Sequence, residues 1–325
     1  MPTPSAALGS LRPELAGSLE EINLAAQRAG YIGLEVLPTF DVAKQSGKFG
    51  KVSLEQLLQI KDTSRKPGGP YKRGEWEFTE DSFTTEEKGW EEPVDERESA
   101  LYTDFVDAEM VAAARAQHFV LQNLEIDIAA MVFNTTTFAS GNSNASAVSN
   151  AWSSSANATP FDDIDTAVRG VWNNTGLVPN AVILNWFKLR DLINTAQFRD
   201  RVASSGAGSS TMAGSVTLQQ VANFFDVEKV IVAGGAKNTA NEAQSRTIAH
   251  LWDTDKVMVA KLATGNDIRE PGLGRTFHWT GDGSAIDGRV ESYPEPQTRS
   301  EIIRRRFEVG SKLIYPNCGY LLTSV

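Results

Sequence analysis

Three histidines and one cysteine are the residues that metal or nucleophilic chemistry would most readily use in this chain. His118, His250 and His278 lie far apart, and none has a second ligand at helical or hairpin spacing, which a zinc site would need. Cys318 has no cysteine partner for an intrachain disulfide and cannot build a structural zinc site alone. We therefore interpret the histidines as core or surface residues and expect no metal and no cofactor.

Two groups of acidic residues could in principle carry carboxylate chemistry. The acids of the run 162–165 could hold Mg²⁺, but they lie in the first turns of an expected helix, where the helix dipole favours negative charge. The pairs Glu86-Glu87 and Glu91-Glu92 could act as paired glycosidase carboxylates, but they lie in a polar stretch with little apolar material to form a cleft. A structural role is the preferred interpretation, and no catalytic residue is predicted.

Nucleotide-binding and hydrolase motifs are absent because the spacing is wrong. Residues 234–239 superficially resemble a phosphate-binding loop but lack the G-x-x-x-x-G-K-[ST] pattern. Residues 281–283 do not extend to G-x-G-x-x-G, and no G-x-S-x-G nucleophile elbow occurs. We interpret both glycine-containing segments as loops that follow strands.

The overall charge limits the classes of partner. The chain has 325 residues and a net charge of −10, which argues against a protein whose main task is to grip nucleic acid, although a container for DNA is compatible with it. No apolar run approaches the roughly 20 residues that span a bilayer, so no membrane partner is expected. Met1 to Leu15 does not resemble a signal peptide, and the single cysteine fits synthesis in a reducing cytoplasm.

The first third of the chain predicts an arm and a hairpin. Residues 1–43 begin with a segment rich in Pro, Ala and Gly, and residues 31–42 are strand-like. Residues 44–98 are charged and poor in aliphatic side chains, with strong turn chemistry at 66–70. This pattern predicts a long two-stranded hairpin that reaches out from the body. Because it has too little apolar material for its own core, we expect it to lie on a neighbouring subunit.

The candidate contacts of this hairpin are its basic tip, two aromatic residues and its acidic rows. They are Arg65, Lys66, Tyr71, Lys72, Arg73, Trp76, Glu86, Glu87, Glu91 and Glu92. A second candidate is the triplet Arg304, Arg305 and Arg306 in an alternating strand, where the outer two share one face and Arg305 points to the other. Salt bridges to another copy, contact with DNA, and ordinary solvated charge all remain open for the triplet.

The rest of the chain predicts an α+β architecture. Apolar residues at three- and four-residue steps predict one long helix over 99–133, and a polar loop with little core follows at 134–159. The helical stripe comprises Leu101, Phe105, Ala108, Ala112, Phe119, Leu124, Ile128 and Met131. Helices are expected at 160–171, 186–198 and 217–225. The strands are expected at 181–184, 229–233, 256–262, 275–279, 302–309, 312–315 and 320–323.

Three segments, in this order, resemble the major capsid proteins of tailed double-stranded-DNA bacteriophages, whose fold is shared with encapsulins and the floors of herpesvirus shells. Residues 78–95 are similar to the returning strand of the family's extended loop and its junction with the spine helix. Residues 218–232 resemble the helix and strand of its axial domain, and residues 302–322 resemble its C-terminal strands.

The resemblance implies five regions. They are an N-terminal arm at 1–43, an extended loop at 44–98, a peripheral domain with the spine helix at 99–159, an axial domain at 160–290, and C-terminal strands at 291–325. The axial domain would cluster at the centres of hexamers and pentamers, and the extended loop would overlap the adjacent subunit.

The function implied is that of a structural subunit without catalysis. It would assemble with copies of itself into an icosahedral shell around double-stranded viral DNA, without sequence specificity, and would reside in the virion after synthesis in the bacterial cytoplasm. Its further partners would be a separate scaffolding protein, a portal protein and, in some shells, a decoration protein. An encapsulin-type nanocompartment shell and a cytoplasmic enzyme with an acidic active site remain the alternatives.

Overall fold

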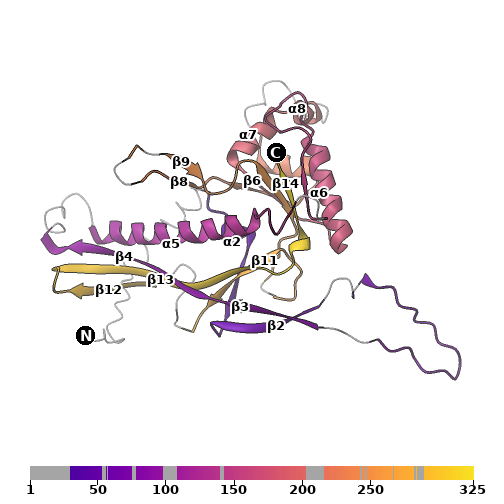
Figure 1. Cartoon of the computed structure of the whole chain (residues 1–325), viewed down its shortest axis with the longest axis horizontal. Coiled ribbons are helices and arrows are strands. Elements are labelled where there is room, and N and C mark those ends of the chain that lie inside the picture. The colour runs from indigo at the N-terminus through magenta and orange to yellow at the C-terminus, as the bar shows by residue number, and fades with distance from the viewer. Residues whose placement is uncertain are drawn as a thin grey trace.

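The computed structural model of the chain has an elongated body from which a thin hairpin projects (Figure 1). The residues that the structure describes are 30–52, 56, 58–74, 78–97, 108–139, 143–202, 216–241, 244–245, 247–265, 267–281, 283 and 289–325. The first part of the predicted arm, residues 1–29, lies outside them, as do Trp76 and residues 98–107 with Leu101 and Phe105. The body is built on two five-stranded sheets, so the predicted α+β class is confirmed.

The first sheet runs along the elongated part of the body. Its strands are β1 (Thr39–Val42), β4 (Glu86–Asp95), β11 (Gly274–Trp279), β12 (Arg289–Glu295) and β13 (Ser300–Leu313). They follow the order β1-β11-β13-β12. Strands β11 and β12 pair with successive parts of one edge of β13, and β4 pairs with its opposite edge. The predicted strands at 302–309 and 312–315 are thus one strand, and β12 was not predicted.

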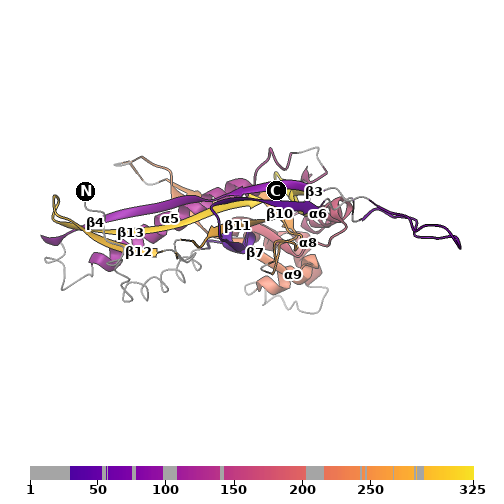
Figure 2. The same cartoon turned by 90° about the horizontal axis from the view of Figure 1, so that it is seen from below.

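Helix α5 (Ala108–Val132) lies along one face of this sheet (Figures 1 and 2). Buried residues recur at three- and four-residue steps along α5, as the sequence pattern predicts. The buried apolar positions are Ala112, Ala113, Ala116, Val120, Leu124, Ile128, Ala129 and Val132. Phe119 and Met131, which were expected on this stripe, are only partly buried at its border.

The second sheet has the order β5-β14-β10-β6-β7. Its strands are β5 (Ala145–Ala147), β6 (Ala181–Asn185), β7 (Lys229–Ala233), β10 (Lys256–Ala260) and β14 (Gly319–Thr323). Alternate residues of β6 enter two different cores: Ile183 packs into the one that contains α5, and Val182 and Leu184 into the one beneath the helices of the far face. Burial on both faces explains why residues 181–184 of β6 are all apolar.

The helices that cover the far face are α6 (Pro160–Thr175), α7 (Trp186–Asn194), α8 (Ala196–Val202) and α9 (Leu218–Phe225). Thr217 caps α9, because its hydroxyl accepts from the Gln220 amide and the Gln220 side chain accepts from the Thr217 amide. Thr159 precedes α6 but makes no side-chain cap. The helix predicted over 186–198 is divided at Thr195, whose extended backbone ends α7.

The projecting hairpin pairs β2 (Ser46–Val52) with β3 (Phe78–Thr84), and residues 58–74 continue away from the body (Figures 1 and 2). The predicted hairpin at 44–98 is divided at Thr85. After this residue the chain becomes β4, which pairs with β13 from Glu86 opposite Val309 to Asp95 opposite Ser300. The acidic second half of the expected hairpin is therefore an edge strand of the body.

Three smaller differences follow from long-range contacts. The strand expected at 31–42 is a short helix, α2 (Gly33–Val36), followed by β1. The loop expected to lack a core buries Phe138 and Trp152 completely. A small hairpin forms from β8 (Ala236–Asn238) and β9 (Ile248–His250), and a 3₁₀ turn, η3 (Pro316–Cys318), precedes β14.

A buried carboxylate joins the start of α2, the long helix α5 and the loop before β10. Glu125 of α5 is 4% exposed and accepts hydrogen bonds from the Ile32 amide at 2.8 Å, the Gly33 amide at 2.7 Å and the Trp252 indole at 2.6 Å. Burial raises the pKa of Glu125, while these three donors oppose the rise. Burial, together with the charge of the same carboxylate, raises the pKa of Tyr31 to about 12.

Replacing Glu125 should destabilise the chain. We expect Glu125→Ala to lower the free energy of unfolding by about 1–3 kcal/mol, because buried donors then lack an acceptor. Urea denaturation measures this, and Glu228→Ala at an exposed acid is the matched control. An equal effect of the two substitutions would contradict the role of the three hydrogen bonds.

The contribution of Glu125 should also depend on pH. A carboxyl whose folded pKa lies above its ordinary value near 4.5 binds its proton more tightly in the folded state. Its contribution to stability is therefore greatest below that value and declines as the pH rises through the raised pKa. The stability advantage of the natural chain over Glu125→Gln should therefore fall as the pH rises above about 4.5, measured by the same denaturation. A constant difference would rule out the titration.

Cys318 should react very slowly with thiol reagents in the folded chain. Its side chain is fully buried, and burial raises the pKa of the thiol to about 11, so almost none of the reactive thiolate exists at neutral pH. A chromogenic disulfide reagent should label Cys318 at least about a hundredfold more slowly in native buffer than in denaturant. Rapid labelling in native buffer would show that β14 and η3 open frequently.

Candidate assembly interface

The base of the hairpin is held firmly to the body. The Phe83 ring stacks on Phe277 of β11 with 4.6 Å between centroids, and Phe49 lies 6.0 Å from the same ring. Lys312 pairs with Asp81, and although burial opposes the charge of Asp81, this contact holds the pKa of its carboxyl below the ordinary value. The hairpin therefore leaves the body in a fixed direction.

Residues 58–74, which we call the arm tip, make contacts mainly with one another. Arg65 stacks on the Tyr71 ring at 4.6 Å and donates to the Gly69 carbonyl at 2.6 Å, and Lys72 pairs with Asp62. The side chains of Lys66 and Arg73 are exposed and make no hydrogen bond or ion pair with another residue that the structure describes. The tip thus presents these two cations to solvent far from the body.

The apolar side chains of the arm tip are also exposed. Ile60 is fully exposed, Leu58 is 59% exposed and Tyr71 is 72% exposed. Exposed apolar residues that lie beside charged ones are typical of a surface that a partner covers.

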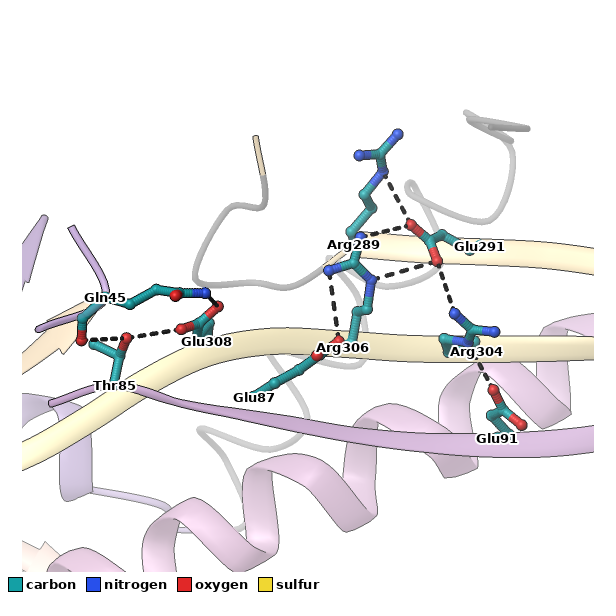
Figure 3. Close-up of polar contacts among 9 residues, drawn as sticks. All are labelled: Gln45, Thr85, Glu87, Glu91, Arg289, Glu291, Arg304, Arg306 and Glu308. Carbon is teal, nitrogen blue, oxygen red and sulfur yellow. Dashed lines mark hydrogen bonds and ion pairs between the residues drawn. The ribbon is translucent and has the colours of Figure 1, made fainter. Parts of the chain in front are cut away.

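Acids and arginines alternate across three strands on the face of the first sheet that lies opposite α5. We call this set the charge ladder; it comprises Glu87, Glu91, Arg289, Glu291, Arg304 and Arg306 (Figure 3). Arg304 lies 2.6 Å from Glu91 and 3.5 Å from Glu291. Arg306 lies 3.0 Å from Glu291 and 3.6 Å from Glu87. A shallow groove of about 530 Å³ runs between the β4 and β13 side chains of the ladder.

The two faces of β13 separate the three predicted arginines. Arg304 and Arg306 lie on the ladder, and Arg305 is 2% exposed on the opposite face, as strand alternation predicts. The carboxylates come from β4 and from β12, a strand that the sequence pattern did not reveal. Only the pairing register places Glu91 and Glu291 on either side of Arg304.

The edge strand β4 also contacts α5 through a line of side chains, which we call the strand–helix seam. Glu92 lies 3.7 Å from Arg115, the Trp90 ring lies 5.3 Å from Phe119, and Lys88 pairs with Asp127. Of the four acids predicted as hairpin contacts, three thus have partners inside the chain. The side chain of Glu86 makes no hydrogen bond or ion pair with another described residue.

A buried polar cluster marks the junction of the hairpin with β4. The Thr85 hydroxyl donates to the Glu308 carboxylate at 2.9 Å, and the Gln45 side chain donates to the same carboxylate at 3.2 Å (Figure 3). The Thr85 amide also donates to the Gln45 carbonyl at 2.8 Å. Sequence reasoning missed this cluster, because its residues are isolated in the chain and meet only in the fold.

The three histidines lie apart in the fold. His118 is exposed beside Tyr31, His250 packs against the Phe187 ring at 4.5 Å, and buried His278 lies 2.9 Å from Asp41. Among the described residues, no three His, Cys, Asp or Glu side chains gather as metal ligands. Within the same residues, no helix is long and apolar enough to cross a bilayer.

Comparison with known proteins finds two curated relatives of similar length. The chain is 23% identical over 275 residues to a major capsid protein of Pseudomonas phage JBD67, covering 84% of each chain. It is 22% identical over 311 residues to a major capsid protein of Burkholderia phage BcepMu, covering 94% of this chain and 95% of the relative. No protein-family model matches.

Solved structures extend this likeness to the fold. A phage-related protein from Bordetella bronchiseptica superposes with a TM-score of 0.69 and 19% identity, covering 96% of both chains. The capsid of cyanophage P-SCSP1u superposes with a TM-score of 0.56 and 11% identity, over 89% of this chain and 86% of that one. The chain has the tailed-phage major capsid fold. An encapsulin from Synechococcus elongatus shares this capsid fold, with a TM-score of 0.51, 11% identity, and 91% and 87% coverage. The resemblance found in the sequence is confirmed.

The charge ladder should contribute to the stability of this capsid fold mainly through Glu291. This carboxylate is 22% exposed and meets arginines on both β12 and β13, whereas Glu87 is 61% exposed and meets one arginine. We expect Glu291→Gln to lower the free energy of unfolding by about 1 kcal/mol and Glu87→Gln to lower it by a few tenths of a kcal/mol. Both losses should become smaller at high salt. Urea denaturation of the two variants provides the measurement. Equal losses of unfolding free energy would mean that the central position of Glu291 does not matter for stability.

Proposed function

We propose that this chain is the major capsid subunit of a tailed bacteriophage and that its copies build the icosahedral shell around packaged DNA. The observation that carries the proposal is the similarity, over nearly the whole chain, to two phage major capsid proteins, together with the capsid fold. The role is structural and requires no cofactor. The subunit is synthesised in the host cytoplasm and resides in the virion.

The shape of the chain supports a subunit that needs neighbours. The arm tip extends beyond the body and exposes apolar and cationic side chains, which favours contact with another copy. We propose that Arg65, Lys66, Tyr71, Lys72 and Arg73, with Trp76, make this contact. Many interfaces of moderate size then add up over a closed shell.

The triplet Arg304–Arg306 fits the structural role better than a DNA-binding one. The ladder neutralises Arg304 and Arg306 with three carboxylates, and Arg305 faces away from solvent. The acidic chain suits a container to which DNA does not adhere. Scaffolding, portal and decoration proteins complete the proposed set of partners.

The two alternatives have less support. An encapsulin shares the fold, but both relatives found by sequence are phage major capsid proteins. An enzyme would need a carboxylate cleft, whereas most of the candidate acids lie on an open sheet face or in ion pairs.

Size-exclusion chromatography coupled to small-angle X-ray scattering tests the proposal. We expect either the scattering of a hollow shell or, without scaffolding protein, a subunit whose radius of gyration clearly exceeds the about 20 Å of a compact domain of this length. A compact monomer or a small closed oligomer would overturn the proposal. The exposed arm predicts the first two outcomes because its residues bury little surface within one chain.

A further inference from the structure

A pocket of about 380 Å³ lies where the hairpin leaves the body, at the end of the strand–helix seam. Its floor is apolar and includes Leu124 and Met131 of α5 and Val309 of β13. Its rim carries Glu86, Lys88 and Asp127. Lys88 and Asp127 pair with each other, so the rim retains one uncompensated charge, the carboxylate of Glu86.

We infer that this pocket receives a basic side chain, Lys66 or Arg73, from the arm tip of a second copy of the chain. Both ends of the contact carry an unpaired charge. The side chains of Glu86 on the rim, and of Lys66 and Arg73 on the tip, make no hydrogen bond or ion pair with another described residue. A long cationic side chain lays its aliphatic stem on an apolar floor and places its charge at an acidic rim. The pocket matches this shape and sign.

The arm tip of the same chain cannot fill the pocket. The base of the hairpin is fixed beside it by Phe83, Phe277 and the contact of Lys312 with Asp81. From there the arm points away from α5 and β4 (Figures 1 and 2). A neighbour that supplies its own arm tip would in turn offer its own pocket, so the contact can repeat around a ring.

The inference rests on the proposed function and specifies which surface of one subunit holds the arm of the next. It also assigns an intersubunit role to the edge strand β4. Three of its four glutamates, Glu87, Glu91 and Glu92, have partners inside the chain, and Glu86 stays available.

Disulfide trapping in the assembled particles tests the contact. We expect the double variants Glu86→Cys/Lys66→Cys or Glu86→Cys/Arg73→Cys to form a ladder of covalent multimers on a non-reducing gel after mild oxidation. Each single variant, and the pairing of Lys66→Cys or Arg73→Cys with Glu228→Cys at an exposed acid of the second sheet's surface, should stay largely monomeric. Buried Cys318 should add no background.

A charge swap gives an independent measurement. Glu86→Lys should reduce the yield of particles about tenfold, because it places like charges together at every repeated contact. Combining it with Lys66→Glu and Arg73→Glu should restore most of the yield. Variants that fold poorly would be recognised by their denaturation curves, and the trapping experiment does not require them.

The outcomes separate the two proposals. Particles that form normally but show no multimer ladder in either double variant would overturn the pocket contact and leave the shell function intact. A natural chain that is only a compact monomer or small oligomer would overturn the shell function itself.

Discussion

The pairing of β13 on both edges is the constraint on which the rest of the structure depends. A strand of fourteen residues must satisfy its backbone donors and acceptors on each side, and no single neighbour does so. One edge pairs with β4, from early in the chain, and the other pairs with β12 and then with β11. This one strand therefore fixes the first sheet, aligns the charge ladder, and sets the point at which the hairpin leaves the body.

Side chains on the two faces of that strand have different tasks. The face toward α5 buries Ile303, Phe307 and Val309 and stabilises the fold through the hydrophobic effect. The opposite face holds its arginines between carboxylates of two neighbouring strands, so it stays polar without a net excess of cations. A surface of this kind gives little attraction to nucleic acid, which suits the inside or the flank of a container.

Glu125 has an analogous position between the two sheets. Its three donors come from the start of α2 and from the loop before β10, so one carboxylate of α5 fixes both relative to this helix. Burial opposes the ionisation of this carboxyl, and the three donors oppose the effect of burial. The hairpin is different, because the body holds its base and leaves its tip for another subunit.

The sequence by itself determined the elements whose pattern is local. The helical stripe of α5, the apolar run of β6, the opposite directions of Arg304 and Arg305, and the turn at 66–70 each follow from side-chain spacing within one segment. The order of three such segments was also enough to indicate the capsid fold.

What only the tertiary structure decided are the pairings between distant segments: that the hairpin ends at Thr85, that β12 exists, and that Glu91 and Glu291 lie on either side of Arg304. The same holds for Glu125, an acid on the buried face of an amphipathic helix whose partners lie about ninety residues before it and over a hundred after it. Such contacts depend on backbone register and burial across the fold, which no local periodicity records.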